Sequence, residues 1–373
     1  MQAATGLLEV DLQALADNYR SLCALAPGCR LAPAVKADGY GLGAAEVAPA
    51  LWAAGARRFF VAYLEEALAL RPLLPDAELC VLGGPQPGEE RDYLAQGLLP
   101  VLNGLEQLAL WQGAAAAAGR PLPALLHLDS GLCRLGLSAA EVARLAAEPE
   151  RLAGVELRLV MSHLACAEEA AHPSNEEQRR RFAALADALP GAAARAPRSL
   201  ANSSGLFLGE GYRFDWGRPG YALYGGNPTP ERPNPMRPVA SLKLRVLQLR
   251  RVDSPSAVGY GATHRVGGPT RLATVAGGYA DGLSRSLSNR GRLFWNRQAV
   301  PIVGRVSMDL TVVDVTALPA DALAVGDFLE LLGEHQGVDD LAAAAGTIGY
   351  EVLTQLGRRY ARRYRPLAAD ARA

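Results

Sequence analysis

Up to about residue 228 the sequence repeats one pattern: a short apolar or β-branched run, a break at Gly, Pro or Asp, and a stretch with helical period. Strands that alternate with helices imply parallel pairing through right-handed crossovers. The apolar runs predict strands at 31–37, 58–63, 79–83, 99–103, 124–130, 155–164, 198–203 and 219–224. Eight such units favour a (β/α)8 TIM-type barrel, an α/β fold, while periodicity alone also permits a doubly wound sheet.

Local signals predict where several of these elements begin and end. An apolar stripe over 11–25 follows Asp11 as N-cap, and a helix over 175–189 is expected behind the capping box of Ser174 and Glu177. The alanine-rich run 114–119 is expected to be a helix end. Residues 7–11 have no place as a ninth barrel strand, so they lead into the first helix or pair with a second domain.

The pattern changes after the proline-rich segment 228–238. Alternation replaces helical stripes, and the apolar even positions of 300–312 predict a half-buried strand. We therefore predict a barrel domain over 1–228, whose residues 1–10 could pair with the second domain, and a mainly β C-terminal domain over 229–373.

Composition argues against several classes of function. The 38 basic and 38 acidic side chains balance, which gives no electrostatic reason to expect nucleic acid or an anionic membrane as a partner. We expect a cytoplasmic chain, because no charge-free run of 18 apolar residues and no signal-peptide pattern occurs. The five cysteines are scattered without a C-x-x-C pair, so we predict neither a disulfide framework nor a metal site.

Only two of the 38 basic residues are lysines, Lys36 and Lys243. Lys36 ends an apolar strand, where burial lowers the pKa of an amine and makes it a usable nucleophile toward an aldehyde. The glycines of its segment AVKADGYGLG, residues 34–43, allow sharp turns, and the Tyr40 hydroxyl can donate to a phosphate oxygen. The simpler alternative is a lysine that reaches solvent beside an ordinary turn.

Other polar residues lie at predicted strand ends, the face that carries barrel active sites. They are Asp129 with Arg134 just beyond it, His163, Asn202 with Ser203, and Arg218 immediately before the last predicted strand. The amides from Gly220 onward could hold a phosphate, although a Pro-Gly turn with a structural arginine explains the same residues. His163 alone is most simply a core-edge histidine, and the tyrosines of the second domain are most simply hairpin aromatics.

Nine blocks, taken in order, resemble the alanine racemase family of fold-type III pyridoxal-phosphate enzymes. They are AVKADGYG, DSGLCRLG, SHLACAEE, ANSSG, RPGYALYG, GYGATH, GGYADG, GRVSMD and TIGYE, and the resemblance extends from residue 7 to about 360. It implies a (β/α)8 barrel followed by a β domain, with pyridoxal 5'-phosphate as cofactor and an amino acid as substrate.

The resemblance also implies roles for individual residues. Lys36 would bind the cofactor covalently and act as the base on one substrate face, and Tyr260 from the partner subunit of a homodimer would act on the other, because racemisation needs two bases. Arg218 would face the pyridine nitrogen and His163 would line the site. The phosphate holders would be Tyr40, Ser203, Tyr350 and the backbone of Gly220 and Tyr221. The substrate would meet Arg134, Met308, Asp309 and the access-corridor residue Tyr279.

Two positions depart from the common family pattern. His127 stands where many members carry a lysine, often carbamylated, that orients the arginine matching Arg134. An imidazole cannot form a carbamate, so chloride or a nearby acid is expected to hold Arg134. Ser199 stands where many members place a histidine against the arginine matching Arg218.

The leading hypothesis is a cytoplasmic, homodimeric alanine racemase that supplies D-alanine for cell-wall precursors. A racemase of broader specificity and the same fold is the first alternative. A non-catalytic pyridoxal-phosphate carrier would keep Lys36 but would not need Tyr260 or the second domain. A nucleic-acid binder conflicts with the neutral charge and would show salt-dependent binding.

Overall fold

A computed structural model describes residues 4–367, which form two compact units. The barrel unit comprises Ala16–Leu223 and Asn227–Met236. The β-rich unit comprises the N-terminal segment through Leu15, Tyr224–Gly226 and the chain from Arg237 onward.

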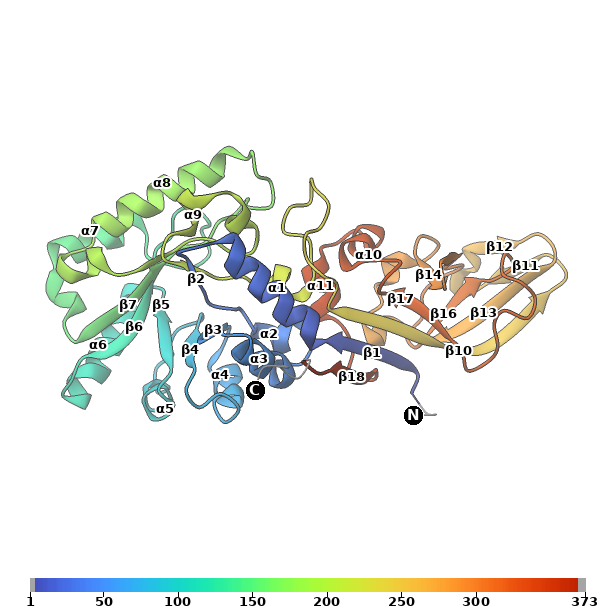
Figure 1. The fold of residues 1–373 in the computed structure, drawn as a ribbon, viewed down its shortest axis with the longest axis horizontal. Helices are drawn as coiled ribbons and strands as arrows, with labels where there is room; N and C mark the ends of the chain where they lie inside the picture. The colour runs from blue at the N-terminus through green and yellow to red at the C-terminus, as the bar shows by residue number, and fades with distance from the viewer. Residues whose placement is uncertain (1–3, 368–373) are drawn as a thin grey trace. The chain divides into compact units, whose positions relative to one another are not determined.

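The barrel unit is built on eight parallel strands in the order β2-β9-β8-β7-β6-β5-β4-β3 (Figure 1). Their bounds are β2 Arg30–Leu31, β3 Arg58–Val61, β4 Glu78–Val81, β5 Leu99–Leu102, β6 Leu122–His127, β7 Val155–Met161, β8 Arg198–Ser199 and β9 Trp216–Gly217. A parallel bridge between Ala34 and Phe60 brings the two ends of this order together, and the Val35 amide donates to the Phe60 carbonyl at 2.9 Å. The expected barrel is therefore confirmed.

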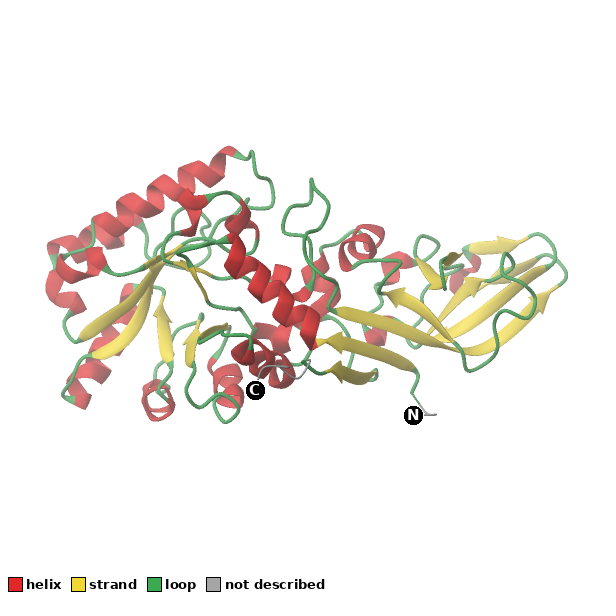
Figure 2. Cartoon of the chain, viewed as in Figure 1, coloured by secondary structure: helices red, strands yellow, loops and turns green. Residues whose placement is uncertain are grey.

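Helices surround these strands (Figure 2). They are α1 Leu12–Leu25, α3 Ala44–Ala53, α4 Leu64–Leu70, α5 Glu90–Gln96, α6 Leu105–Ala118, α7 Ala139–Ala147, α8 Pro173–Asp187 and α9 Glu210–Arg213. Because helices cover one face and barrel side chains the other, the strands are mostly apolar: Phe59, Val81 and Leu125 are fully buried.

The last barrel strand differs from the prediction. The strand expected at 219–224 is instead β9 at Trp216–Gly217, and Tyr221–Tyr224 forms a 3-10 turn. Pro219 and Gly220 explain the early end, because proline cannot donate to the ladder and glycine favours turns. Arg218 therefore follows a strand, as Lys36 and His163 also do, and does not precede one.

Helix boundaries follow local chemistry with one exception. The Ala14 amide donates to Asp11 Oδ1 at 2.8 Å, which confirms Asp11 as N-cap, and α6 ends at Ala118 with Gly119 as its left-handed C-cap at φ 63°. The capping box predicted at Ser174 is wrong. Helix α8 begins at Pro173 behind His172, whose Nδ1 accepts from the Ser174 amide, because proline is preorganised for the first helical position.

The β-rich unit contains a sheet in the order β15-β14-β17-β10-β1-β18, in which β13 joins β10 to β16. The bounds are β1 Gly6–Asp11, β10 Ala240–Val252, β13 Thr270–Ala276, β14 Arg292–Trp295, β15 Gln298–Pro301, β16 Leu310–Asp314, β17 Phe328–Leu332 and β18 Ala361–Arg365. A separate hairpin pairs β11 (Ser256–Val258) with β12 (His264–Val266). Two helices, α10 Val338–Ala345 and α11 Gly349–Thr354, complete this mainly β unit.

Two sequence expectations meet in this sheet. Strand β1 pairs with β10 and β18 and continues directly into α1. Residues 7–11 therefore do both things that were considered: they lead into the first helix and they pair with strands of the β-rich unit. The continuous strand predicted over 300–312 is wrong: β15 ends at Pro301 and β16 begins at Leu310. Between them, Gly304 has φ 76°, and Ser307 closes a turn by accepting from the Leu310 amide, which interrupts the strand although the apolar alternation of the sequence continues.

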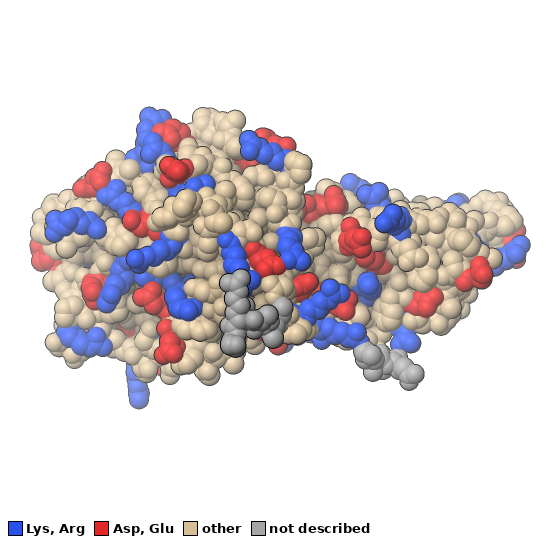
Figure 3. Space-filling model, viewed as in Figure 1, with Lys and Arg blue, Asp and Glu red and all other residues tan. Residues whose placement is uncertain are grey.

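Basic and acidic side chains are interspersed on the face shown in Figure 3. Each unit carries both signs there. Within residues 4–367, no helix is long and apolar enough to cross a membrane.

Candidate active site

Lys36 lies at the start of a left-handed turn. The segment Lys36–Tyr40 (α2) has left-handed backbone angles at Ala37, Asp38 and Gly39, and Tyr40 follows with φ 55°. This conformation costs about 1–2 kcal/mol for each residue other than glycine, so surrounding contacts must hold it. One such contact is the Ala44 amide, which donates to Asp38 Oδ1 at 2.8 Å.

The environment of the Lys36 amine is partly buried and strongly cationic. Burial and the charges of Arg134 and Arg218 lower its pKa, while Glu66 acts in the opposite sense. The amine has no hydrogen-bond partner among the residues the structure describes. A partly desolvated amine among cations loses its proton more readily than a surface lysine, as a nucleophile or base requires.

Arg218 is buried at the end of β9 without a carboxylate partner in the described chain. Its guanidinium donates to the Ser199 hydroxyl and to the Ser162 carbonyl. Burial lowers the pKa of Arg218 to about 10, so the group stays cationic at neutral pH. The Ser199 hydroxyl in turn donates to the Trp216 carbonyl at 2.6 Å, which fixes Ser199 as an acceptor for Arg218. No role for Ser162 could be predicted from the sequence, because its contribution is a backbone carbonyl.

His163 and Arg218 meet directly. Arg218 Nη2 lies 3.4 Å from His163 Nδ1, and because guanidinium only donates, Nδ1 is the acceptor. Burial, together with the charges of Arg218, Arg134 and Lys36, lowers the pKa of His163 well below its usual range. His163 is therefore neutral at physiological pH.

His127 is held by a residue that the sequence analysis missed. Asn103 uses its amide nitrogen to donate to the Leu82 and Val101 carbonyls, both at 2.9 Å, so its Oδ1 faces His127 Nδ1 at 2.8 Å. Burial, aided by Arg218 and Arg134, lowers the pKa of His127 to about 4. His127 is thus a neutral imidazole with its proton on Nδ1, at the position where the resemblance implies a lysine in many members. Asn103 directly follows β5, so its strand-end position was the available signal.

Arg134 lies on an exposed loop that Asp129 organises. The backbone amides at 131–133 donate to the Asp129 carboxylate at 2.8–3.2 Å. Burial alone would raise the pKa of Asp129, but these hydrogen bonds outweigh it and lower the pKa. Within the described residues no acidic side chain pairs with Arg134, so the acid that we expected to hold it is not found there.

Ser203, Gly220 and Tyr40 form a small polar cradle. The amides of Gly220 and Ala222 donate to the Ser203 hydroxyl at 3.0 and 3.1 Å. A Cβ atom at Gly220 would lie 2.1 Å from the Tyr40 hydroxyl, so this position must remain glycine for the buried Tyr40 to stay in place. Tyr221 follows at the start of the 3-10 turn.

In the β-rich unit, a different group of predicted residues comes together. Tyr279 and Met308 lie on neighbouring segments, because the Tyr279 amide donates to the Ser307 carbonyl and the Ala280 amide to the Met308 carbonyl, both at 3.0 Å. Tyr260 lies in the loop of the β11–β12 hairpin. Gly259 of this loop packs against Arg305, which belongs to the segment that also contains Ser307 and Met308.

Arg359 fixes Asp309 within this group. Its guanidinium binds the buried Asp281 carboxylate through two hydrogen bonds, at 2.5 and 2.7 Å, and Asp309 Oδ1 at 2.7 Å. Three of the gathered side chains remain largely exposed: Tyr260 at 72%, Met308 at 53% and Tyr279 at 45%. Tyr350 lies in the same unit, in the first turn of α11.

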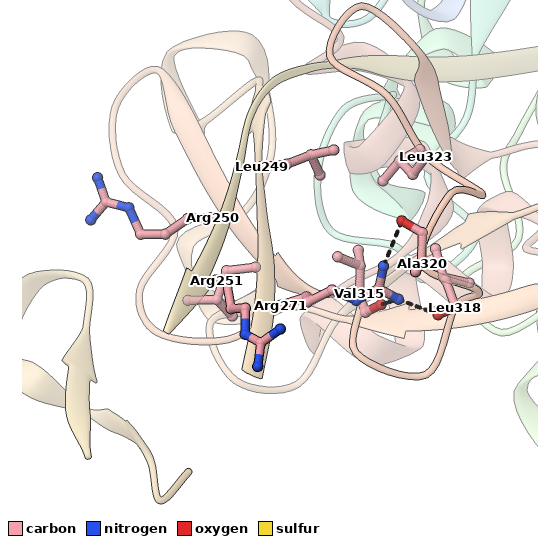
Figure 4. Close-up of a pocket in the computed structure, with 9 residues that line it drawn as sticks. Leu249, Arg250, Arg251, Arg271, Val315, Leu318, Ala320 and Leu323 are labelled. Carbon is pink, nitrogen blue, oxygen red and sulfur yellow. Dashed lines mark hydrogen bonds between the residues drawn. The ribbon is translucent and has the colours of Figure 1, made fainter. Parts of the chain in front are cut away.

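A cavity of about 190 Å³ in the β-rich unit has a structural explanation. Arg271 lines it together with Leu249 and Arg250, and donates to the carbonyls of Val315 and Ala320, both at 3.0 Å (Figure 4). These bonds tie the loop after β16 to β13. We therefore assign Arg271 to loop anchoring.

Comparison with known proteins agrees with this arrangement. The model of the alanine racemase N-terminal domain matches residues 10–228, and that of the C-terminal domain matches 239–364. The alanine racemase of Rhodospirillum rubrum is 51% identical over 97% of this chain and 96% of its own length. That of Acidiphilium cryptum is 53% identical over 95% of this chain and 97% of its own length.

Solved structures give the same result. The alanine racemase of Bartonella henselae, whose crystal structure has covalently bound pyridoxal phosphate, superposes with a TM-score of 0.92 at 39% identity. The alignment covers 97% of this chain and 99% of that one. The nine ordered sequence blocks, the barrel with its β-rich unit and these relatives agree, and the chain belongs to the alanine racemase family.

Proposed function

We propose that this chain is a pyridoxal-phosphate-dependent alanine racemase that interconverts L- and D-alanine as a homodimer. The observation that carries the proposal is the Lys36 amine, which is partly buried, has a lowered pKa and lies among Arg134 and Arg218 at the strand-end face of the barrel. The relatives named alanine racemase match nearly the whole chain.

The residues present fit the cofactor. Ser203, Tyr40 and the backbone of Gly220 and Tyr221 would hold its phosphate, because Gly220 binds the Ser203 hydroxyl and, lacking a side chain, lies directly against the Tyr40 hydroxyl. The cationic surroundings of Lys36 suit an anionic group. When bound through Lys36, pyridoxal phosphate supplies an electron sink for the substrate carbanion.

Arg218 would face the pyridine nitrogen. Its guanidinium is fixed by Ser199 and Ser162 and has no carboxylate beside it, so it remains cationic and does not give up a proton readily. Beside a bound cofactor, Arg218 would therefore leave the ring nitrogen unprotonated and weaken the electron sink, which would favour proton exchange at the α-carbon over transamination. The neutral His163 supports Arg218 without adding charge.

Two bases would exchange the α-proton. Lys36 would remove or return it on one face of the substrate, and Tyr260 of a second subunit would do so on the other. Arg134 would bind the substrate carboxylate together with the segment of Met308 and Asp309 from that subunit. The exposure of Tyr260, Tyr279 and Met308 supports this assignment, because a second barrel would cover them.

Supply of D-alanine for cell-wall precursors is the physiological role that we propose. Relatives of Agrobacterium fabrum and Mesorhizobium japonicum, 49% and 50% identical, are named catabolic alanine racemases, so breakdown of alanine is the competing role. Deletion of the gene decides between them. A requirement for D-alanine supports synthesis, and loss of growth on alanine alone supports breakdown.

Racemisation of a panel of L- and D-amino acids by the purified protein tests the activity. We expect alanine to be the preferred substrate. Comparable rates for several larger amino acids would favour the broader racemase, and covalent cofactor without turnover of any amino acid would favour a carrier.

Mixing two inactive variants tests the shared site. In a mixed dimer of Lys36→Ala and Tyr260→Phe subunits, one site has both wild-type residues. Random exchange should therefore restore about a quarter of wild-type activity. No recovery despite demonstrated subunit exchange would contradict a site built from two chains.

A further inference from the structure

Glu66 makes two contacts that neither the sequence pattern nor the proposed chemistry assigns to it. One oxygen, Oε1, accepts from the Ala37 amide at 2.6 Å, directly after Lys36. The other, Oε2, accepts from the Ala62 amide at 2.6 Å, directly after β3. A single carboxylate therefore ties the Lys36 turn to the neighbouring barrel strand.

The left-handed turn needs such a support. Its own backbone bonds, including Gly39 to the Val35 carbonyl at 3.0 Å and Gly41 to the Ala37 carbonyl at 2.8 Å, stabilise its middle and end. Asp38 ties the end to Ala44. The amide at the start, that of Ala37, is the one that Glu66 accepts. Helix α4, which carries Glu66, lies beside α2 and α3 (Figure 1).

Glu66 also contributes the negative charge that raises the pKa of the Lys36 amine. Arg134 from the loop after β6 and Arg218 from the end of β9 both disfavour the ammonium form, and His163 at the end of β7 is neutral. Glu66 opposes the two arginines. Its carboxylate thus affects both the geometry and the protonation of Lys36.

A helix-capping role explains only half of this geometry. Glu66 is the third residue of α4, and its bond to the Ala62 amide resembles the return contact of a capping box. That bond needs one oxygen. The second oxygen is directed to the Lys36 turn, which a cap does not require.

We propose that Glu66 is a positioning residue that holds the left-handed turn and thereby fixes the Lys36 side chain. The inference rests on the proposed role of Lys36. Its test needs neither cofactor nor turnover. The proposal for Glu66 can therefore be wrong while the proposed racemase activity is right, and the activity can be wrong while the proposal for Glu66 is right.

The chain has only two lysines, so the signal of the Lys36 amine can be followed individually. Reductive methylation of the full-length protein before cofactor is added labels Lys36, Lys243 and the N-terminus, and ¹³C NMR then follows each signal through a pH titration. Glu66→Gln keeps the size of the side chain, but its amide nitrogen donates and cannot accept from a second backbone amide. We expect the pKa of Lys36 to fall further in this variant while that of Lys243 does not change.

Hydrogen exchange of residues 36–43 supplies the second measurement. Loss of a charged hydrogen bond should speed amide exchange in the turn by roughly 10- to 100-fold. Glu65→Gln is the matched control, because it removes the same charge from the adjacent, exposed position of α4, and it should change neither measurement. Unchanged Lys36 titration and unchanged exchange in a folded Glu66→Gln protein would overturn the proposal.

Glu66→Asp keeps the inference testable if Glu66→Gln does not fold. The shorter carboxylate retains the charge but cannot reach both amides. We expect faster exchange in the turn and a Lys36 pKa close to that of the wild type. Wild-type exchange in Glu66→Asp would show that the two-amide contact does not hold the turn.

Discussion

The two groups of candidate site residues are held in different ways. In the barrel unit, Arg218 and His127 are buried, bound by side-chain hydrogen bonds and shifted in pKa. In the β-rich unit, Tyr260, Tyr279 and Met308 are exposed and are positioned through their backbone. The barrel residues are therefore held by hydrogen bonds within their own unit, whereas the exposed side chains of the β-rich group are those that we propose a second subunit covers.

Lys36→Arg should have the largest effect. Arginine keeps the positive charge but its guanidinium cannot form the imine, so we expect loss of covalent cofactor and a fall in racemisation of roughly 10⁴-fold or more. Visible absorbance, borohydride trapping and a coupled alanine assay measure both effects. Full activity with retained covalent cofactor would refute the assignment of Lys36.

Tyr260→Phe tests the exposed group. We expect covalent cofactor to be retained while racemisation falls by roughly 10²- to 10⁴-fold, most in the direction in which Tyr260 removes the proton. Because the side chain is 72% exposed, the free energy of unfolding should change by no more than about 0.5 kcal/mol. Equal rates in both directions, unchanged from the wild type, would contradict the two-base proposal.

His127→Asn tests the buried group through pH. Burial and two arginines lower the pKa of His127 to about 4, below its unfolded value near 6.5. The unfolded chain therefore binds the proton first as pH falls, and this site costs up to roughly 3 kcal/mol of stability between pH 6.5 and pH 4. Asparagine can still donate to Asn103 but does not titrate.

Urea unfolding across this pH range measures the effect. The stability of the wild type should fall more steeply with acid than that of His127→Asn, and the two curves should run parallel above pH 7. Parallel curves throughout would mean that the folded and unfolded states bind the proton at His127 equally, and the lowered pKa of His127 would then be wrong.

The sequence indicates candidate site residues but not the contacts that hold them. Lys36 and Tyr260 are candidates because their surrounding blocks resemble a family, and the alternation of strands and helices predicted the barrel around Lys36. Asn103 and Glu66 were missed, because a polar residue after a strand or in a first helical turn is common, and the partners that matter here, His127 and Ala37, lie 24 and 29 residues away. Periodicity failed at 300–312, where alternation continues through a turn that contains Gly304.

Lys243→Arg should have the smallest effect and serves as the control for Lys36→Arg. Lys243 lies on β10 between the buried Leu242 and Leu244, and the strand register places it opposite Glu330 of β17. Arginine preserves the charge and the apolar stem there, so we expect wild-type activity and a change in unfolding free energy within about 0.5 kcal/mol. Urea unfolding and the same alanine assay check both. A loss of more than about 1 kcal/mol, or of activity, would show that this position also requires lysine, and the contrast between one replaceable and one irreplaceable lysine would no longer hold.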